Sequence, residues 1–292
     1  MACKGIVLAG GTGTRLYPLT LSVSKQLMPV YNKPLIYYPL SVLMLADIQD
    51  ILVISTPTDR ALFERLLGDG KRFGMRLSYA TQAEPRGIAE ALIIGADFIG
   101  KDNIALILGD NIFHGEALEQ RIAVAAKKTD RATIFSYRVS RPERFGVVDL
   151  DDQGQPRAII EKPASPPSDK AVTGLYIYPS DVVGVARALK PSARDELEIT
   201  DVNQNYLARQ RLDVEFLGKG YMWLDTGTHN DLLDAANYVA TLERRQGQMI
   251  GCMEEVAWRK GWIGDGDLAR LAEPIRERAY GQYLLSLLAH KH

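Results

Sequence analysis

The sequence predicts an α/β fold with three layers, in which a doubly wound, mostly parallel but mixed sheet lies between helices and a helical segment follows at the C-terminus. Two observations indicate this fold. Short, almost continuously apolar runs alternate with helical spacings up to about residue 130, a rhythm typical of parallel sheets. The length of 292 residues suits one large α/β domain and buries enough surface to need no disulfide or metal for its core.

The first half of the chain predicts strands and helices in alternation. Residues 4–9 are almost all apolar, as in strands buried on both faces of a parallel sheet. Pro34 suits the first turn of a helix, which we expect over residues 35–46. Right-handed crossovers place the carboxyl ends of such strands along one edge, where ligands bind. The remaining expected elements are strands over 51–55, 76–80 and 103–108, and helices over 58–67, 87–99 and 116–127.

The second half of the chain predicts a run of strands before helices return. We expect a mixed sheet that extends the first one, then helices over 230–246 and from 254 to the end. We therefore divide the chain into an α/β domain over 1–245, with halves at 1–130 and 131–245, and a helical extension over 246–292 that packs on it. The expected strands cover 132–138, 145–150, 157–161 and 171–178.

Composition excludes several classes of protein. With 46% hydrophobic residues and a net charge of −1, the chain is an ordinary globular protein without the basic surface that nucleic-acid binding needs. Two cysteines, Cys3 and Cys252, form no disulfide framework and suit a reducing compartment. We find no secretory leader and no apolar run of the ~20 residues that span a bilayer. We therefore expect a cytoplasmic protein that binds neither nucleic acid nor membrane.

The first 46 residues contain no Asp or Glu but carry Lys4, Arg15, Lys25 and Lys33. A random sequence of this composition would lack acids over such a stretch about once in four hundred cases. A buried first strand and helix that need few charges would explain the pattern. A pocket that receives an anion explains it as well, and we favour this second interpretation.

A glycine-rich loop follows the first strand at residues 10–15. Such loops point backbone N–H groups at phosphates. Leu16 stands where a dinucleotide-binding loop would have its third glycine, and Gly-Lys-Ser/Thr, the mark of a P-loop, is missing. Arg15 within the loop and Lys25-Gln26 after it suit the phosphates of a nucleoside triphosphate. A tight turn with surface cations is the alternative.

These residues resemble a known family. The sequences GGTGTRLYPLT at 10–20 and KQLMP at 25–29 are similar to the signature of sugar-phosphate nucleotidyltransferases. The nearer resemblance, over almost the whole chain, is to the glucose-1-phosphate thymidylyltransferases. It rests on YYPL at 37–40, LGDN at 108–111, EKP at 161–163, VTGLY at 172–176, ELEITDVN at 196–203 and WLDTGT at 223–228.

The resemblance implies a three-layer nucleotidyltransferase fold and a reaction. In that family dTTP and α-D-glucose 1-phosphate give dTDP-glucose and pyrophosphate, the first step of dTDP-sugar biosynthesis such as that of dTDP-L-rhamnose. Residues 1–130 would then be the nucleotide half and 131–245 the sugar-phosphate half. Because the attacking phosphate oxygen is already an anion, the reaction needs positioning and charge neutralisation more than a general base.

Two aspartates are the candidate metal ligands. Asp110 follows a predicted buried strand, at the ligand-binding edge of the sheet, and Asp225 lies in WLDTG far along the chain. From the residues alone, each could equally be a solvated turn residue. The resemblance implies that both bind Mg²⁺, which needs only one or two carboxylates.

The resemblance also assigns the remaining site residues. Arg15, Lys25 and Lys162 would be catalytic, with Arg15 on the triphosphate and Lys25 near the α-phosphate. Lys162 and Arg194 would hold the phosphate of glucose 1-phosphate, and Gln26 and Gln82 offer amide donors and acceptors to a pyrimidine. The nucleotide-binding residues would be Leu8, Ala9, Gly10, Gly11, Thr12, Gly13, Thr14, Arg15, Gln26, Gln82, Gly87 and Asp110. The sugar-phosphate-binding residues would be Gly146, Glu161, Lys162, Val172, Tyr176 and Arg194.

Two alternatives stay open. One is a uridylyltransferase on the same scaffold, because thymine differs from uracil by one methyl group, worth about 1–3 kcal/mol. The other is a regulatory protein that binds nucleotide sugars without catalysis. The sequence departs from the usual family pattern at Ile88-Ala-Glu90 and at Asn111-Ile-Phe-His114. The family further implies a homotetramer inhibited by a dTDP-sugar end product, which the apolar C-terminal segment would suit.

Overall fold

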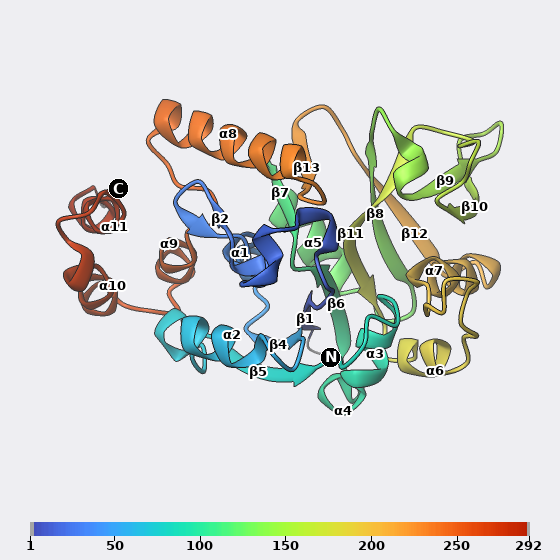
Figure 1. Cartoon of the computed structure of the whole chain (residues 1–292), viewed down its shortest axis with the longest axis horizontal. Coiled ribbons are helices and arrows are strands. Elements are labelled where there is room, and N and C mark those ends of the chain that lie inside the picture. Colours follow the sequence, from blue (N-terminus) through green and yellow to red (C-terminus); the bar gives the residue numbers. More distant parts are fainter. Residues whose placement is uncertain (1–2, 291–292) are drawn as a thin grey trace.

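The structure, a computed structural model, describes residues 3–290. Residues 1–2 and 291–292 lie outside the described residues. Residues 291–292 are the last two of the predicted C-terminal extension. Within that range a nine-stranded sheet has the order β10-β9-β11-β6-β1-β4-β5, and β8 pairs with both β11 and β12 (Figure 1). Its strands are β1 (Cys3–Ala9), β4 (Asp50–Ser55), β5 (Arg76–Thr81), β6 (Asn103–Leu108), β8 (Ala132–Arg138), β9 (Gly146–Leu150), β10 (Pro156–Glu161), β11 (Lys170–Tyr178) and β12 (Leu212–Leu217).

The sheet is mixed, as the sequence predicts. Strands β6, β1, β4 and β5 run parallel to one another. Strand β11 joins β6 in the antiparallel direction, and β8 and β9 pair with β11 in the same way. Two small sheets lie beside the main one, formed by β2 (Pro29–Val30) with β3 (Lys33–Pro34), and by β7 (Asn111–Gly115) with β13 (Tyr221–Asp225).

Helices cover both faces of the sheet, which confirms the three predicted layers. Successive residues of β1 point to opposite faces, so that Ile6 and Leu8 belong to one core and Val7 and Ala9 to the other. One face packs against α1 (Tyr37–Leu45), α2 (Arg60–Leu67), α5 (Leu118–Ala126) and α9 (Met253–Arg259). The other packs against α3 (Glu90–Ile94), α4 (Ala96–Ile99), α6 (Val182–Arg187) and α7 (Ile199–Ala208).

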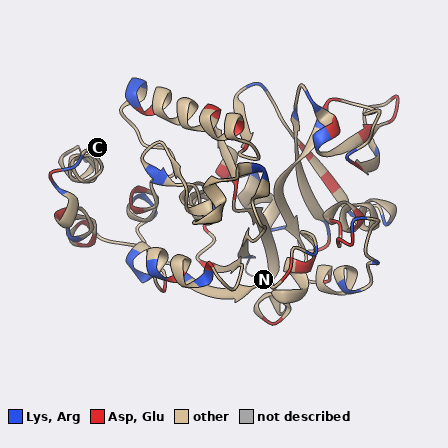
Figure 2. Ribbon diagram, viewed as in Figure 1, with Lys and Arg blue, Asp and Glu red and all other residues tan. Residues whose placement is uncertain are grey.

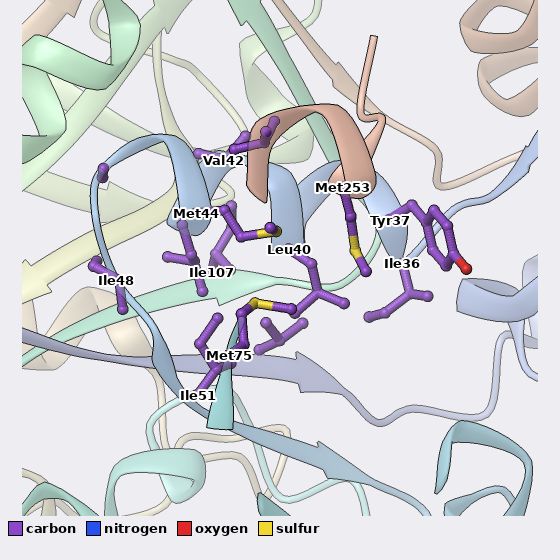
Figure 3. Packing of buried hydrophobic residues seen from close by; sticks show 14 of the residues in the cluster. Ile36, Tyr37, Leu40, Val42, Met44, Ile48, Ile51, Met75, Ile107 and Met253 are labelled. Atoms are coloured by element: carbon purple, nitrogen blue, oxygen red, sulfur yellow. The ribbon is translucent and has the colours of Figure 1, made fainter. Parts of the chain in front are cut away.

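Helix α1 lies at the centre of the first core. Figure 3 shows Met44 of this helix beside Ile107 of β6, and Leu40 between Met75 and Met253 of α9. All five side chains are buried. The C-terminal segment therefore contributes to the core of the α/β domain through α9.

The C-terminal segment is helical, as expected, and follows α8 (His229–Gln246). Thr228 caps α8, because its hydroxyl accepts a hydrogen bond from the Asp231 N–H at 3.2 Å. Helices α10 (Asp265–Ala272) and α11 (Ala279–Ala289) pack on each other and lie, in Figure 1, at the opposite end of the molecule from β9 and β10. The remaining helical turns are η1 (Thr14–Leu16), η2 (Leu19–Leu21), η3 (Lys25–Leu27), η4 (Lys71–Phe73), η5 (Pro142–Arg144) and η6 (Glu273–Ile275).

Two predicted helices differ from the structure. Pro34 does not open a helix but lies in β3, and α1 begins at Tyr37 with Pro39 in its first turn, where no intrahelical N–H is needed. The single helix expected over 87–99 is α3 and α4, interrupted at Gly95. A Cβ atom at Gly95 would lie 2.7 Å from Ile6 Cδ1, so a larger residue would require the Ile6 side chain to shift.

No helix among residues 3–290 is both long and apolar enough to cross a bilayer.

Candidate active site

The cations of the acid-free N-terminal stretch divide into two kinds. In Figure 2 the ribbon from β1 to α1 carries blue but no red. Lys4 pairs with Asp102 at 3.2 Å, and Lys33 forms a buried ion pair with Glu243 at 2.7 Å. These two lysines are therefore structural, and the anion pocket that we inferred from the stretch depends on its other two cations.

A cleft of about 600 Å³ lies at the carboxyl ends of β1 and β6 and continues to β9, β10 and β11. It brings together residues from both halves of the α/β domain. Of the predicted site residues, the cleft is lined by Leu8, Gly10, Gly11, Arg15, Gln26, Gln82, Gly87, Asp110, Gly146, Glu161, Lys162, Val172, Tyr176, Arg194 and Asp225. Five further predicted site residues do not line the cleft as the structure describes it: Ala9, Thr12, Gly13, Thr14 and Lys25.

The glycine-rich loop needs its glycines for backbone conformation. Gly11 has φ +99° and Gly13 has φ +59°, values that residues with a side chain rarely adopt. A side chain at Gly11 would meet open space, whereas a Cβ atom at Gly13 would lie 2.8 Å from Thr20 Cγ2. The Thr20 hydroxyl also donates a 2.7 Å hydrogen bond to the Gly13 carbonyl. Thr20 thus fixes the loop at Gly13. Arg15 remains exposed at the cleft.

The two candidate metal ligands are neighbours in space. Strands β7 and β13 pair so that Asp225 lies opposite Asn111, the residue after Asp110. The backbone N–H and the hydroxyl of Thr226 both donate to the Asp110 carbonyl, at 3.3 and 2.9 Å. A two-stranded sheet therefore joins carboxylates that are far apart in the sequence.

Lys25 and Asn111 each contact one oxygen of the Asp110 carboxylate. Lys25 Nζ lies 2.7 Å from Oδ2, and Asn111 Nδ2 donates to Oδ1 at 2.8 Å. Lys25 therefore acts beneath the cleft, although it does not line it. Asn111 is itself fixed, because its Oδ1 accepts from Trp223 Nε1 at 2.6 Å and from the Gly174 N–H at 3.1 Å.

The two carboxyl groups have opposite pKa shifts. Burial raises the pKa of Asp110, but the charge and hydrogen bond of Lys25 and the hydrogen bond of Asn111 outweigh it, so the net pKa lies below the usual value. Burial and the negative charge of Asp110 raise the pKa of Asp225 to about 6, and the positive charges of Lys25 and Arg15 only partly oppose this. One site thus holds two carboxylates that resist being charged together.

This pair fits Mg²⁺. Magnesium takes oxygen ligands, typically one or two carboxylates with water and substrate phosphates. Among residues 3–290, no group of three or more His, Cys, Asp or Glu side chains has the arrangement of a metal site. Asp110 and Asp225 are neighbouring carboxylates in the cleft, and a cation between them would offset both the burial and the repulsion by Asp110 that raise the pKa of Asp225.

We expect the Asp225 carboxyl to titrate near pH 6 without metal and at a lower pH when Mg²⁺ is added. Because a metal ligand must be deprotonated, Mg²⁺ affinity should fall as the pH drops below about 6. Carbon-13 NMR of labelled aspartates, assigned with the Asp225→Asn variant, measures both effects. A carboxyl pKa that Mg²⁺ does not move would contradict the metal assignment.

Arg144, which the sequence analysis did not single out, adds a second guanidinium beside Arg15. The position that a Cβ atom would occupy at Gly227 lies 3.0 Å from Asp225 Oδ2, 3.3 Å from Arg15 Nη1 and 3.5 Å from Arg144 Nη2. Arg144 is held there by Asp231, at 2.8 Å. Two guanidinium groups and a carboxylate thus converge on one glycine at the mouth of the cleft.

Acidic and hydroxyl groups surround the part of the cleft next to β9 and β10. Glu161, at the end of β10, accepts a 2.6 Å hydrogen bond from Thr200 and a 3.2 Å hydrogen bond from Arg194. Arg194 also contacts Glu198 at 2.9 Å, so its guanidinium is fixed in place and partly neutralised. A Cβ atom at Gly146 would lie 3.2 Å from the Thr200 hydroxyl and 3.3 Å from Glu161 Oε2, so both polar groups pack closely on this glycine.

Lys162 has an unusual backbone. Its φ is +42°, in the left-handed region that non-glycine residues rarely occupy, and its N–H donates to the Phe145 carbonyl at 3.0 Å. Such conformations persist where the surrounding structure fixes them, and they occur often at functional sites. The turn directs the chain after β10 so that Lys162 lines the cleft with its side chain half exposed.

Gly87 joins the two halves of the domain at the cleft. It has φ +99°, and a Cβ atom there would lie 2.4 Å from the Leu197 carbonyl. Around it, Leu197 donates to the Arg86 carbonyl at 2.7 Å and accepts from the Ala89 N–H at 3.1 Å. Only glycine permits this backbone contact across the cleft.

Several lining residues, including Arg144, Glu198 and Thr200, were not predicted from the sequence. Glu198 and Thr200 lie in the segment ELEITDVN, on which the family resemblance partly rests, so this segment is the sequence signal that could have identified them. Asn111 lies next to Asp110, and its role depends on contacts with Trp223 and Gly174 that only the fold creates. The full set that was missed is Leu108, Asn111, Pro85, Ile88, Arg144, Phe145, Gly174, Glu196, Glu198, Ile199, Thr200 and Trp223.

Comparisons with known proteins show the family of this chain. Residues 4–241 match the Nucleotidyl transferase family. The chain is 57% identical to a glucose-1-phosphate thymidylyltransferase of Neisseria meningitidis, over 98% of this chain and 99% of the relative. It is 53% identical to that of Mycobacterium tuberculosis H37Rv, over the same shares.

Solved structures give a similar result. A crystal structure of a Bacillus anthracis protein assigned to the glucose-1-phosphate thymidylyltransferases, in complex with sucrose, has a TM-score of 0.76 and 41% identity, covering 81% of this chain and 95% of that one. A UDP-glucose pyrophosphorylase complexed with UDP-glucose has a TM-score of 0.72 and 25% identity, covering 82% and 99%.

Proposed function

The chain belongs to the nucleotidyl transferase family, together with the glucose-1-phosphate thymidylyltransferases, and from that premise we propose its reaction. The enzyme joins dTTP and α-D-glucose 1-phosphate to give dTDP-glucose and pyrophosphate, with Mg²⁺ held by Asp110 and Asp225. The product supplies dTDP-sugar biosynthesis, such as that of dTDP-L-rhamnose, in the cytoplasm.

One observation carries this proposal. A single cleft has cations at both ends and a carboxylate pair between them. Arg15 and the glycine-rich loop lie on one side, Lys162 and Arg194 on the other, and Asp110 and Asp225 complete it. Two polyanions that repel each other need such an arrangement to approach within bonding distance.

The reaction needs little acid–base chemistry from the protein. A phosphate oxygen of glucose 1-phosphate attacks the α-phosphorus of dTTP, and the bond to the departing pyrophosphate breaks. Arg15 neutralises the triphosphate, and Lys25 adds positive charge beneath the α-phosphate, beside Asp110. Lys162 and Arg194 orient the attacking phosphate. Mg²⁺, when bound, neutralises phosphate oxygens and aligns them.

The experiment that tests the proposal measures pyrophosphate release on mixing dTTP, glucose 1-phosphate and Mg²⁺. We expect release that depends on all three. A regulatory protein that binds nucleotide sugars would give none, which would overturn the proposal. Comparing kcat/KM for dTTP and UTP separates a thymidylyltransferase from a uridylyltransferase, since the expected preference for dTTP would be absent in the latter.

We expect Lys162→Ala to raise the KM for glucose 1-phosphate at least about tenfold, because one charge-assisted contact to phosphate is lost. The KM for dTTP should change little. Alanine makes the same demands on the backbone as lysine, so the melting temperature should stay the same. Lys190→Ala, which removes an exposed lysine in the same half, is the control. An unchanged KM for glucose 1-phosphate in Lys162→Ala would rule out this role.

For regulation, we propose a homotetramer with a separate inhibitor site. A second cavity, of about 270 Å³, lies between α1, β7 and α9 and is lined by Phe113, His114, Met249, Cys252 and Arg259 among others. It is far smaller than the active-site cleft and open to solvent, which suits completion by another subunit. Sedimentation at working concentration, with and without a dTDP-sugar, tests both parts, and a monomer insensitive to that ligand would contradict them.

A further inference from the structure

The amide of Gln82 has only one group left to offer a ligand. Gln82 is buried on β5's carboxyl side, and its Nε2 donates to the Gly87 carbonyl at 3.1 Å and to Glu90 Oε2 at 2.7 Å. These two bonds use both amide hydrogens. The remaining group, Oε1, lies 2.7 Å from the position of a Cβ atom at Gly10, on the cleft side. From the sequence we expected Gln82 to offer a ligand both donors and an acceptor. In the structure only the acceptor, Oε1, remains available.

Glu90 fixes this orientation. An amide could in principle turn over and exchange its oxygen and nitrogen. Here both neighbours of Nε2 are acceptors, because a carbonyl and an ionised carboxylate have no hydrogen to donate. Turning the amide would place Oε1 against the charged Glu90 carboxylate, so the orientation with Oε1 toward the cleft is strongly favoured.

We propose that Glu90 is a positioning residue that selects the nucleobase through Gln82. This inference rests on the proposed function. An acceptor-only Gln82 suits a base that presents a ring N–H, as thymine and uracil do at N3. It opposes cytosine, whose N3 is an unprotonated acceptor. Thymine and uracil are not separated by this contact.

A purely structural role for Glu90 makes a different prediction. Glu90 is the first residue of α3, where a negative charge can stabilise the helix terminus. Losing that contribution would impair dTTP and dCTP alike. The ratio of kcat/KM for dTTP to that for dCTP therefore distinguishes the two roles, and it also cancels any change in attraction for the triphosphate, which both nucleotides share.

The test is a series at position 90. Glu90→Lys replaces the charged one of the two acceptors with a charged donor. Its attraction for Oε1 outweighs the remaining neutral bond to the Gly87 carbonyl, so the amide turns Nε2 toward the base. We expect the dTTP/dCTP ratio to fall at least about tenfold, the usual size of a mismatch at a buried polar contact. Glu90→Gln can still present an oxygen to Nε2, so it should keep the ratio within about threefold.

Three further variants make the test specific. Glu84→Lys makes the same charge change at an exposed carboxylate that pairs with Arg86, and it should leave the ratio unchanged. In a Gln82→Leu background, Glu90→Lys should have no further effect on the ratio. If Glu90→Lys does not fold, Glu90→Met takes its place, with an expected fall of about threefold or more.

An unchanged ratio in Glu90→Lys, or in Glu90→Met where that variant is needed, would overturn the inference. Failure of the proposed function would look different, because the unmodified protein would then release no pyrophosphate from either nucleotide. A ratio near one in the unmodified, active enzyme would likewise contradict the role of Glu90 while leaving the proposed function standing.

Discussion

Replacing Asp225 with asparagine should lower kcat at least about 100-fold while making the metal-free protein more stable. The loss of activity follows from the loss of one of two metal ligands. The gain in stability follows from the raised pKa of Asp225, because the folded protein buries this carboxylate and holds it beside Asp110 at an energetic cost.

The sign of the stability change follows from the two pKa values. The Asp225 carboxyl has its ordinary value of 3.8 in the unfolded chain and about 6 in the folded one. Between these values the folded state binds more protons, so stability falls as the pH rises from about 4 to about 6. Above that range the cost is about 3 kcal/mol, and asparagine avoids it. Thermal unfolding of Asp225→Asn and the unmodified protein in a metal chelator, at about pH 4 and at about pH 8, measures the difference on either side of this window.

Asp110→Asn is the matched comparison, and its effect on stability has the opposite sign. It should lower kcat by a similar factor, but it leaves the largely buried ammonium of Lys25 without its partner. The free energy of unfolding should fall by roughly 1–3 kcal/mol. Ordinary activity in both variants would refute the metal assignment, and equal stability changes would refute the account of the charges.

Arg15→Ala should lower kcat/KM for dTTP by about 100-fold or more with only a small loss of stability. Arg15 is exposed, and its charge acts within the fold mainly by partly offsetting that of Asp225, so little of the stability depends on it. Its guanidinium lies beside that of Arg144 at the mouth of the cleft. A group that stabilises transferring phosphates typically contributes a factor of this size.

Steady-state kinetics with each substrate varied in turn measures the effect of Arg15→Ala. The KM for glucose 1-phosphate should change much less than kcat/KM for dTTP. Arg65→Ala removes an exposed arginine on α2, away from the cleft, and should change neither. Equal kinetics for the two variants would show that Arg15 has no part in binding the triphosphate.

The fold followed from patterns that are local in the sequence. Apolar runs such as 103–108 predicted central strands because both faces of these strands are buried. The strands β7 and β13 could not be predicted in the same way, because each is short and only partly apolar. Their pairing joins residues more than a hundred positions apart, and no local pattern encodes such a contact.

In the candidate site, too, the residues marked by local motifs could be predicted and those defined by contacts between distant segments could not. Its charged residues were found through motifs, because Arg15, Asp110 and Lys162 occupy positions that a family signature marks. Their supporting contacts were not, since Asn111 and Arg144 gain their roles from neighbours brought by the fold. Lys33 was counted among the cations that indicated an anion pocket, but Glu243 neutralises its charge outside the cleft.

The central claim is that Asp110 and Asp225 hold a divalent cation between the two substrates. The most direct measurement is anomalous diffraction from a crystal of the protein with dTTP and Mn²⁺ in place of Mg²⁺. The account predicts one peak that is coordinated by both aspartate carboxylates and by phosphate oxygens of the nucleotide. A peak that touches neither carboxylate, with dTTP bound in the cleft, would contradict it.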